Sequence, residues 1–347
     1  MALNLLQTLR IWFRPLLVAC FSAQIPWGLR WRTLLLQPIS LITYSVATIP
    51  YLFSRPFAVE QLPITPTQSV RAAIFKSPGT GKGRRLRPLH VDIHGGSFIG
   101  GLAESNAVFD ERVAKETGAV VVGITYRFAP EHTFPVAIDD VDETIKWIQD
   151  HAELRWGADP TLITVGGSSA GGNLALASTQ QLNCQAQSPM GLKGIVTFCA
   201  AIDLRLSPWE KPRPAKMPKF DPLAMLLPLM DAYAKPARVR HMNDPRLSPT
   251  LAKPDTLPER ILLVVAAIDI LYAEQMAFAE RVNEQDRRYG KLEKPRVETM
   301  VEDEGFHAYL EVPDAIVKRE IKDKAFTRGV DFLRETYAIH GWNWEPN

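Results

Sequence analysis

The segment that most constrains this chain is a short glycine-rich stretch between an apolar run and a helical pattern. Gly167-Ser168-Ser169-Ala170-Gly171 has the form G-x-S-x-G, follows the apolar run 162–165 and precedes helix-favouring residues at 172–177. A turn this tight between a strand and a helix leaves no room for side chains at its first and last positions, which favours glycine there. A flexible glycine–serine turn is the alternative, but the flanking runs favour strand, turn and helix. We therefore expect the hydroxyl of Ser169 to be held out at the carboxyl end of a strand, where open α/β sheets bind their ligands.

A second glycine segment, His94-Gly95-Gly96-Ser97, ends another β-like run at 89–93. Acyl-transfer enzymes stabilise an oxyanion with backbone N–H groups held in a dry site. Because glycine has no side chain to block a substrate oxygen, Gly95 and Gly96 suit this role. Ala170, the residue after the serine, would supply a third N–H donor. The sequence thus predicts an oxyanion hole made by Gly95, Gly96 and Ala170.

A serine nucleophile needs a base, and the base needs an acid to orient it. In this arrangement the acid follows the serine along the chain and the histidine comes last. Asp269 comes two residues after the apolar run 261–267 and is the predicted acid; it also suits the N-cap of a helix beginning near 271, and the two roles are compatible. Glu274 and Asp303 are the competing acids.

Two histidines follow Asp269 in the chain, His307 and His340. His307 lies in a loop just after an apparent strand, whereas His340 lies in the C-terminal tail beside a glycine and a tryptophan. The position of His307 favours it as the base, and that of His340 favours a surface or capping role.

Six segments, in this order, resemble the hormone-sensitive-lipase-like esterases of the α/β-hydrolase superfamily. The resemblance covers roughly residues 68–335, and the segments that carry it are 94–98, 126–132, 134–140, 167–173, 269–271 and 305–307. It implies an α/β-hydrolase fold, a mostly parallel central sheet flanked by helices, with a helical cap. It also implies a serine hydrolase that cleaves carboxylic esters through an acyl-enzyme.

The chain departs from that family's pattern at two positions. Ser97 stands where the family usually has a third glycine, and Ser168 stands where it often has an acidic residue or threonine. Both are expected to shape the pocket near the acyl carbonyl. His94 is expected to fix the oxyanion loop by hydrogen bonding. Arg127 is expected to form a buried pair with Asp139 or Asp140, because a buried guanidinium needs such a partner.

Composition narrows the function classes further. The chain has 347 residues, 46% of them hydrophobic, and a net charge of +2, which argues against disorder and against a nucleic-acid partner. Cys20, Cys184 and Cys199 are few and widely spaced, so a disulfide framework is not expected. The seven histidines show no metal-ligand spacing, and we expect no metal and no cofactor.

Alternating strand and helix patterns begin near residue 68. Continuous apolar strands between helices indicate a mostly parallel sheet that is covered on both faces. The expected strands are 70–76, 87–93, 119–124, 162–165, 194–198, 261–267 and 296–301, and the expected helices are 107–117, 136–153, 170–182, 272–288 and 314–337.

Two regions fall outside this rhythm. Residues 1–57 are apolar and interrupted by prolines, which predicts short helices, and 206–258 are rich in proline with an apolar stretch at 223–230. We expect cap elements at 1–57 and 206–246, and a catalytic domain formed by 58–205 and 247–347. Surface-helix packing is the alternative for the second region, and a membrane anchor, an interfacial helix or a cleaved signal for the first. The sequence favours a cytoplasmic protein, with peripheral membrane association through 1–57 as the alternative, over a secreted one.

The expected substrate is a small-molecule ester with a short or medium acyl group and an apolar partner group, because both cap segments are apolar. An acyltransferase on the same scaffold would use the same three residues and is the main alternative. A non-enzymatic ligand receptor is a third reading, and a lost member of the triad would favour it. The sequence indicates no oligomeric state.

Overall fold

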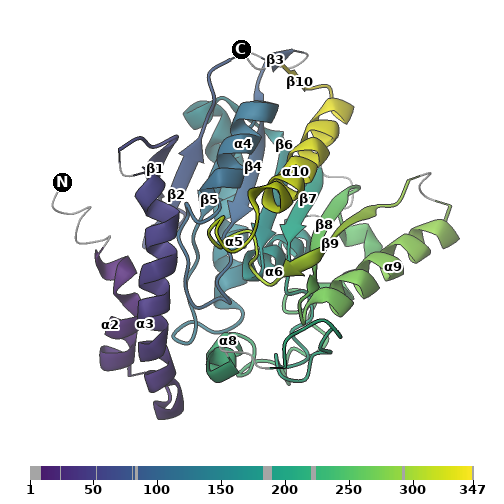
Figure 1. Ribbon diagram of the computed structural model, residues 1–347. Helices are drawn as coiled ribbons and strands as arrows, with labels where there is room; N and C mark the ends of the chain where they lie inside the picture. The colour runs from purple at the N-terminus through teal and green to yellow at the C-terminus, as the bar shows by residue number, and fades with distance from the viewer. Residues whose placement is uncertain are drawn as a thin grey trace.

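A computed structural model of the chain describes residues 9–23, 25–51, 53–79, 81–82, 85–182, 190–219, 224–290 and 294–345. Its centre is an eight-stranded sheet in the order β1-β2-β5-β4-β6-β7-β8-β9 (Figure 1). Strands β4 to β9 run parallel, and β2 pairs antiparallel with both β1 and β5. The predicted mostly parallel α/β sheet is thus confirmed. The strands are β1 (Phe57–Leu62), β2 (Val70–Phe75), β4 (Arg87–Ile93), β5 (Val120–Ile124), β6 (Ala158–Ser168), β7 (Gly194–Phe198), β8 (Ile261–Ile268) and β9 (Val297–Phe306).

Helices cover both faces of the sheet, and each face has its own hydrophobic core. One core joins the sheet to α5, α6 and α9, and the other joins it to α4 and α10. Strand β5 is apolar at successive positions because both of its faces are buried. Val120, Val122 and Ile124 face the first core, and Val121 faces the second. The helices are α4 (Ala107–Thr117), α5 (Val136–Trp156), α6 (Ala170–Ala177), α7 (Thr179–Leu182), α9 (Tyr272–Arg288) and α10 (Arg319–Ile339).

Several boundaries differ from the sequence-based expectations. The helix expected at 170–182 is divided into α6 and α7, and the last helix begins at Arg319 rather than at 314. Strand β1 was not predicted, because it is an edge strand with exposed Ala58 and Val59 and carries no continuous apolar run. The two-residue strands β3 (Gly81–Lys82) and β10 (Asn343–Trp344), which pair with each other, were also not predicted because they are too short for a periodic pattern.

In the described part of the N-terminal region, α2 (Arg14–Phe21) and α3 (Trp27–Thr48) lie side by side (Figure 1). The prediction that prolines cut this region into short helices was wrong for α3, whose 22 residues continue through Pro38. One proline removes a single backbone donor, and the rest of so long a helix retains its bonds. The stretch Trp27–Tyr51 is long and apolar enough to span a membrane, and 17% of its most apolar window is buried. Residues 1–8 of the expected N-terminal cap lie outside the described residues.

In its described residues, the second irregular region contains the short elements η2 (Ala224–Leu226), α8 (Leu227–Met230), η3 (Pro249–Leu251) and η4 (Pro254–Thr256). Leu223, the first residue of the expected apolar stretch, lies outside the described residues. Arg32 of α3 donates from Nε to the carbonyl oxygen of Met225 at 3.0 Å, so the two irregular regions touch each other.

Candidate active site

The turn from β6 to α6 brings two backbone segments into close approach. A Cβ atom at Gly167 would lie 2.6 Å from the carbonyl oxygen of Ile93, and one at Gly171 would lie 1.9 Å from the same oxygen. Neither distance leaves room for a side chain. Ser169, between the two glycines, has φ 50° and ψ −113°, which a serine adopts only where its surroundings hold it. The end of β4 and the turn after β6 therefore fix the position of Ser169 together.

The three predicted catalytic residues lie in one hydrogen-bonded row. The Oγ of Ser169 is 3.0 Å from Nε2 of His307, and Nδ1 of His307 is 2.7 Å from Oδ2 of Asp269. Asp269 is 1% exposed, and its Oδ1 accepts the N–H of Leu271 at 3.0 Å. Asp269 thus bonds both to the histidine and to the residue that precedes α9, so the two roles that the sequence left compatible remain compatible in the structure.

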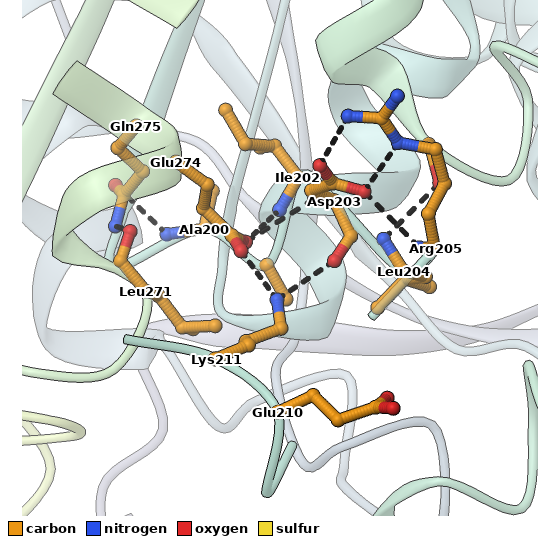
Figure 2. Close-up of polar contacts among 12 residues, drawn as sticks. Ala200, Ile202, Asp203, Leu204, Arg205, Glu210, Lys211, Leu271, Glu274 and Gln275 are labelled. Atoms are coloured by element: carbon orange, nitrogen blue, oxygen red, sulfur yellow. Dashed lines mark hydrogen bonds and ion pairs between the residues drawn. The ribbon is translucent and has the colours of Figure 1, made fainter. Parts of the chain in front are cut away.

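The alternative acids and the alternative base have other surroundings. Glu274 lies in α9 and accepts the N–H groups of Ile202 at 2.8 Å and Asp203 at 3.2 Å, and it forms an ion pair with Lys211 (Figure 2). Asp303 is exposed on β9, and His340 lies at the C-terminal end of α10. His307, by contrast, directly follows β9. The neighbouring strand β8 is directly followed by Asp269.

The charges around His307 determine its pKa. Burial alone would lower the pKa of His307, but the charge and hydrogen bond of Asp269 more than offset this and raise the pKa above its ordinary value of 6.5. The carboxylate of Glu311 acts in the same direction, and the ammonium of Lys211 acts against it. The imidazolium form of His307 is therefore stabilised at the place where a base would receive a proton.

The predicted oxyanion loop lies directly against the serine turn. A Cβ atom at Gly95 would lie 3.0 Å from the carbonyl oxygen of Ser168, and Gly96 has φ 106°, a value that favours glycine. Nδ1 of His94 is 2.6 Å from the carbonyl oxygen of Gly95, so His94 does bond to the loop as expected. Burial lowers the pKa of His94 to about 4, which keeps its ring neutral. Ser97 has φ 52°, a left-handed conformation in which the family's usual glycine would be less strained.

The structure adds neighbours that sequence reasoning missed. The Oγ of Ser168 donates to Oδ1 of Asn106 at 3.3 Å, and Nδ2 of Asn106 donates to the buried Asp92 at 2.7 Å. Ser168 also interacts with Glu311: burial raises the pKa of that carboxyl group, and the interaction with Ser168 partly offsets this effect. No motif marks Asn106 or Glu311, because they reach the site from a helix start and from a loop that only the folded chain brings together.

Arg127 and Asp140 form the expected pair, but its arginine is less buried than expected. Nε of Arg127 lies 2.9 Å from Oδ2 of Asp140, and Nη2 lies 2.6 Å from Oδ1. The Asp140 side chain is 1% exposed and that of Arg127 is 44% exposed, so solvent reaches the guanidinium. Asp139, the other candidate, pairs with Arg246 instead.

Among the described residues, no group of three or more histidine, cysteine, aspartate or glutamate side chains is arranged to hold a metal ion. Cys20 is exposed and Cys199 is buried, and both are free thiols, whereas Cys184 lies outside the described residues.

The pair of Lys211 and Glu274 gives a first prediction, on stability. Their side chains are 3% and 10% exposed, so replacing Lys211 by methionine leaves a buried carboxylate without its partner. We expect Lys211→Met to lower the free energy of unfolding by about 3–5 kcal/mol at neutral pH, measured by urea denaturation. Lys216→Met, an exposed lysine in the same segment, should change it little.

The pH dependence of that loss tests its cause. Burial already raises the pKa of Glu274 above 4.5, and removing Lys211 removes the main influence that lowers it. The native state of the variant then holds its proton more tightly than the unfolded state, so its stability should fall as the pH rises above about 4.5. Adding Glu274→Gln should restore most of the stability and remove this slope; an equal loss at all pH values would show that packing, not charge, is responsible.

Comparison with known proteins agrees with this geometry. A family model described as alpha/beta hydrolase fold matches residues 90–311. The chain is 33% identical over 138 residues to arylacetamide deacetylase-like 2 of Homo sapiens, a match covering 39% of this chain and 34% of that protein. It is 42% identical over 105 residues to arylacetamide deacetylase of Oryctolagus cuniculus, covering 29% of this chain and 26% of that protein. These matches therefore span about a third of the length of the curated relatives or less.

A solved structure extends the likeness to most of the chain. An esterase of Pyrobaculum calidifontis superimposes with a TM-score of 0.67 at 25% identity, and the match covers 86% of this chain and 90% of that one. The family model alone spans well over half of the 347 residues and includes the serine turn, Asp269 and His307. The chain belongs to the α/β-hydrolase fold family, among its hormone-sensitive-lipase-like esterases.

Proposed function

We propose that this protein is a serine hydrolase that cleaves carboxylic esters through an acyl-enzyme intermediate. The observation that carries the proposal is the continuous row from Ser169 Oγ through the ring of His307 to the buried carboxylate of Asp269. Each member meets the need of the previous one: the hydroxyl needs a base, and the base needs a group that fixes its tautomer and stabilises its cation. The names of the relatives, esterases and deacetylases, support the same class of reaction.

In the proposed first half-reaction, Ser169 Oγ forms a bond to the ester carbonyl carbon while Nε2 of His307 takes its proton. The carbonyl oxygen becomes an oxyanion, and the N–H groups of Gly95, Gly96 and Ala170 receive it. The bond to the alcohol oxygen then breaks, and that oxygen leaves with the proton from His307. In the second half, His307 takes a proton from water, the hydroxide adds to the acyl carbon, and the acid leaves as Ser169 regains its proton.

The backbone supports the proposed oxyanion hole. Ala170 is the first residue of α6, and the first N–H groups of a helix have no partner within the helix. The helix dipole adds partial positive charge at the same end. Gly95, without a side chain, lies against Ser168 and is therefore close to the nucleophile. In this proposal His94 and Ser168 hold the glycine loop and the serine turn in place, and Ser97 belongs to the same loop, directly after Gly96.

The proposed substrate is a small-molecule ester with a short or medium acyl group. The proposed catalytic domain consists of residues 58–205 and 247–347. Residues 1–57 and 206–246 form the proposed cap, supported by the contact of Arg32 with Met225 and by the ring of Tyr233, which stacks on Phe98 with centroids 4.1 Å apart. The His307 side chain is 39% exposed, so water can reach the base. This favours hydrolysis over transfer to another alcohol.

The nucleophile is tested by covalent labelling. Ser169→Ala should abolish reaction with a fluorophosphonate probe and reduce hydrolysis of a chromogenic acetate ester by several orders of magnitude, leaving about 10³–10⁴-fold catalysis over water. Ser168→Ala is the matched control and should still be labelled. A labelled peptide that carries the probe on Ser168, or labelling that persists in Ser169→Ala, would refute the assignment.

The raised pKa of His307 predicts a pH profile. Because His307 must be neutral to accept a proton, kcat/KM should fall on the acid side with a midpoint above 6.5. Glu311→Gln removes one attraction that favours the cation, so its midpoint should lie lower and its relative activity at acid pH should be higher. Asp303→Asn, which alters an exposed carboxylate on β9, should leave the midpoint unchanged; a shift there and none in Glu311→Gln would overturn this account.

We also propose that the outer face of the N-terminal helices rests on an anionic lipid surface. Large apolar side chains are exposed there, with Phe21 80%, Trp27 84% and Ile42 65% accessible. The first 59 residues contain five arginines and no acidic residue, although the net charge of the whole chain is only +2. Apolar side chains beside arginines match a surface of acyl chains and anionic head groups. Arg14 donates to the carbonyl oxygen of Ile99 and Tyr44 accepts the N–H of Gly101, so these helices are attached to the catalytic body. This favours helices that lie on the membrane surface over helices that cross it.

Vesicle sedimentation tests this proposal. The protein should pellet with vesicles containing phosphatidylglycerol, less with pure phosphatidylcholine, and it should be released by salt or carbonate. Phe21→Ser with Trp27→Ser should reduce binding, whereas Leu154→Ser, which alters an apolar side chain 93% exposed on α5, should not. Equal binding to both kinds of vesicle, no binding, or a carbonate-resistant pellet would contradict surface association by charge and apolar contact.

A further inference from the structure

The loop that follows β4 has an unusual backbone. Four of its residues have φ in the left-handed region: Gly96 at 106°, Ser97 at 52°, Phe98 at 62° and Gly101 at 133°. One bond within the loop, from Ile99 N–H to the carbonyl oxygen of Gly96 at 2.9 Å, closes a turn. Serine and phenylalanine rarely adopt such values, and they persist only where neighbouring groups hold the backbone. The loop conformation therefore depends on contacts from outside it.

Arg14 of α2 provides one of these contacts. Its Nη1 donates to the carbonyl oxygen of Ile99 at 3.0 Å, and its Nη2 donates to that of Phe128 at 3.2 Å and to Oε2 of Glu131 at 3.3 Å. The guanidinium carbon also lies 4.9 Å from the centre of the Phe128 ring. Because a guanidinium is planar and its donors are fixed relative to one another, one side chain sets the loop's distance from the segment after β5.

Tyr44 of α3 provides a second contact at the other end of the turn. Its hydroxyl accepts the N–H of Gly101 at 3.1 Å, and the side chain is 6% exposed. Gly101 packs closely against His94, since a Cβ atom at Gly101 would lie 2.1 Å from Nδ1 of that histidine. The same Nδ1 bonds to the carbonyl oxygen of Gly95, so Tyr44 holds the loop at a point that contacts the histidine bonded to Gly95. The loop is also bound from its own domain, where Ala129 N–H donates to the carbonyl oxygen of Phe98 at 2.8 Å.

We propose that Arg14 and Tyr44 are positioning residues for the oxyanion loop. By fixing the carbonyl of Ile99 and the N–H of Gly101, they hold the turn that Ile99 N–H closes on the carbonyl oxygen of Gly96. Through this turn they orient the N–H groups of Gly95 and Gly96 toward Ser169. The inference rests on the proposed function, because this orientation matters only if those N–H groups receive an oxyanion. It gives the N-terminal helices a role in the rate of the reaction, besides covering the site.

Two conservative changes test it. Tyr44→Phe keeps the ring and removes the acceptor of Gly101 N–H, and Arg14→Met keeps most of the packing and removes the donors. Since these contacts act on the transition state, we expect kcat for a chromogenic acetate ester to fall about 10-fold or more in each, with KM nearly unchanged. Thr43→Val and Arg10→Met are the controls. Both residues are exposed, and Thr43 donates to carbonyl oxygens of its own helix, so neither change should alter kcat.

Active-site titration with the fluorophosphonate normalises kcat to folded sites, so partial unfolding does not imitate the effect. Arg14→Lys supplies a rescue test: a single ammonium can still donate to one carbonyl, and kcat should lie between the wild type and Arg14→Met. Unchanged kcat in both Tyr44→Phe and Arg14→Met, or losses that appear in KM alone, would overturn the positioning role. A wild-type protein that the probe does not label would instead refute the proposed function itself.

Discussion

At the carboxyl ends of β4 and β6, two backbone segments approach so closely that Gly167 and Gly171 could not carry side chains. The carbonyl oxygen of Ile93 occupies the space where Cβ atoms of Gly167 and Gly171 would lie. Between the two glycines Ser169 has a positive φ of 50°, and Gly95 lies against the residue before the serine. The serine turn and the glycine loop are therefore parts of one rigid unit, and the proposed nucleophile and oxyanion hole depend on the same packing.

The ionisable groups beside this unit come from the ends of β8 and β9. Asp269 follows β8 and His307 follows β9, so adjacent parallel strands place the acid and the base side by side. Polar contacts stabilise the turn after β8 and the loop after β7. Asp269 accepts the N–H of Leu271, and Glu274 of α9 accepts two backbone N–H groups of the loop after β7 (Figure 2). Lys211 neutralises Glu274 and attaches the second irregular region at the same point. The proposed cap is thus tied to the site by charge here and by Arg14 and Tyr44 on the other side.

Much of the fold could be predicted from the sequence because its strongest signals are local. The buried strands are continuous apolar runs, and the two glycine segments mark turns whose geometry excludes side chains. The same signals, with chain order, pointed to Ser169, Asp269 and His307, which the structure brings within hydrogen-bonding distance. Proline content misled the prediction for α3, since a long helix can lose one backbone bond at Pro38 and continue.

The contacts that could not be predicted join residues far apart in the chain. Nothing near Arg14 or Tyr44 indicates that they meet residues 99 and 101, and the partners of Ser168 come from a helix start and from beyond His307. These pairings follow from the way the elements pack, which no local pattern records. The most direct test of the account is a crystal structure of the protein after reaction with a phosphonate ester. The account predicts phosphorus bonded to Oγ of Ser169 and a phosphoryl oxygen within about 2.7–3.1 Å of the backbone nitrogens of Gly95 or Gly96 and of Ala170. A phosphoryl oxygen directed into solvent, away from these three nitrogens, would contradict it.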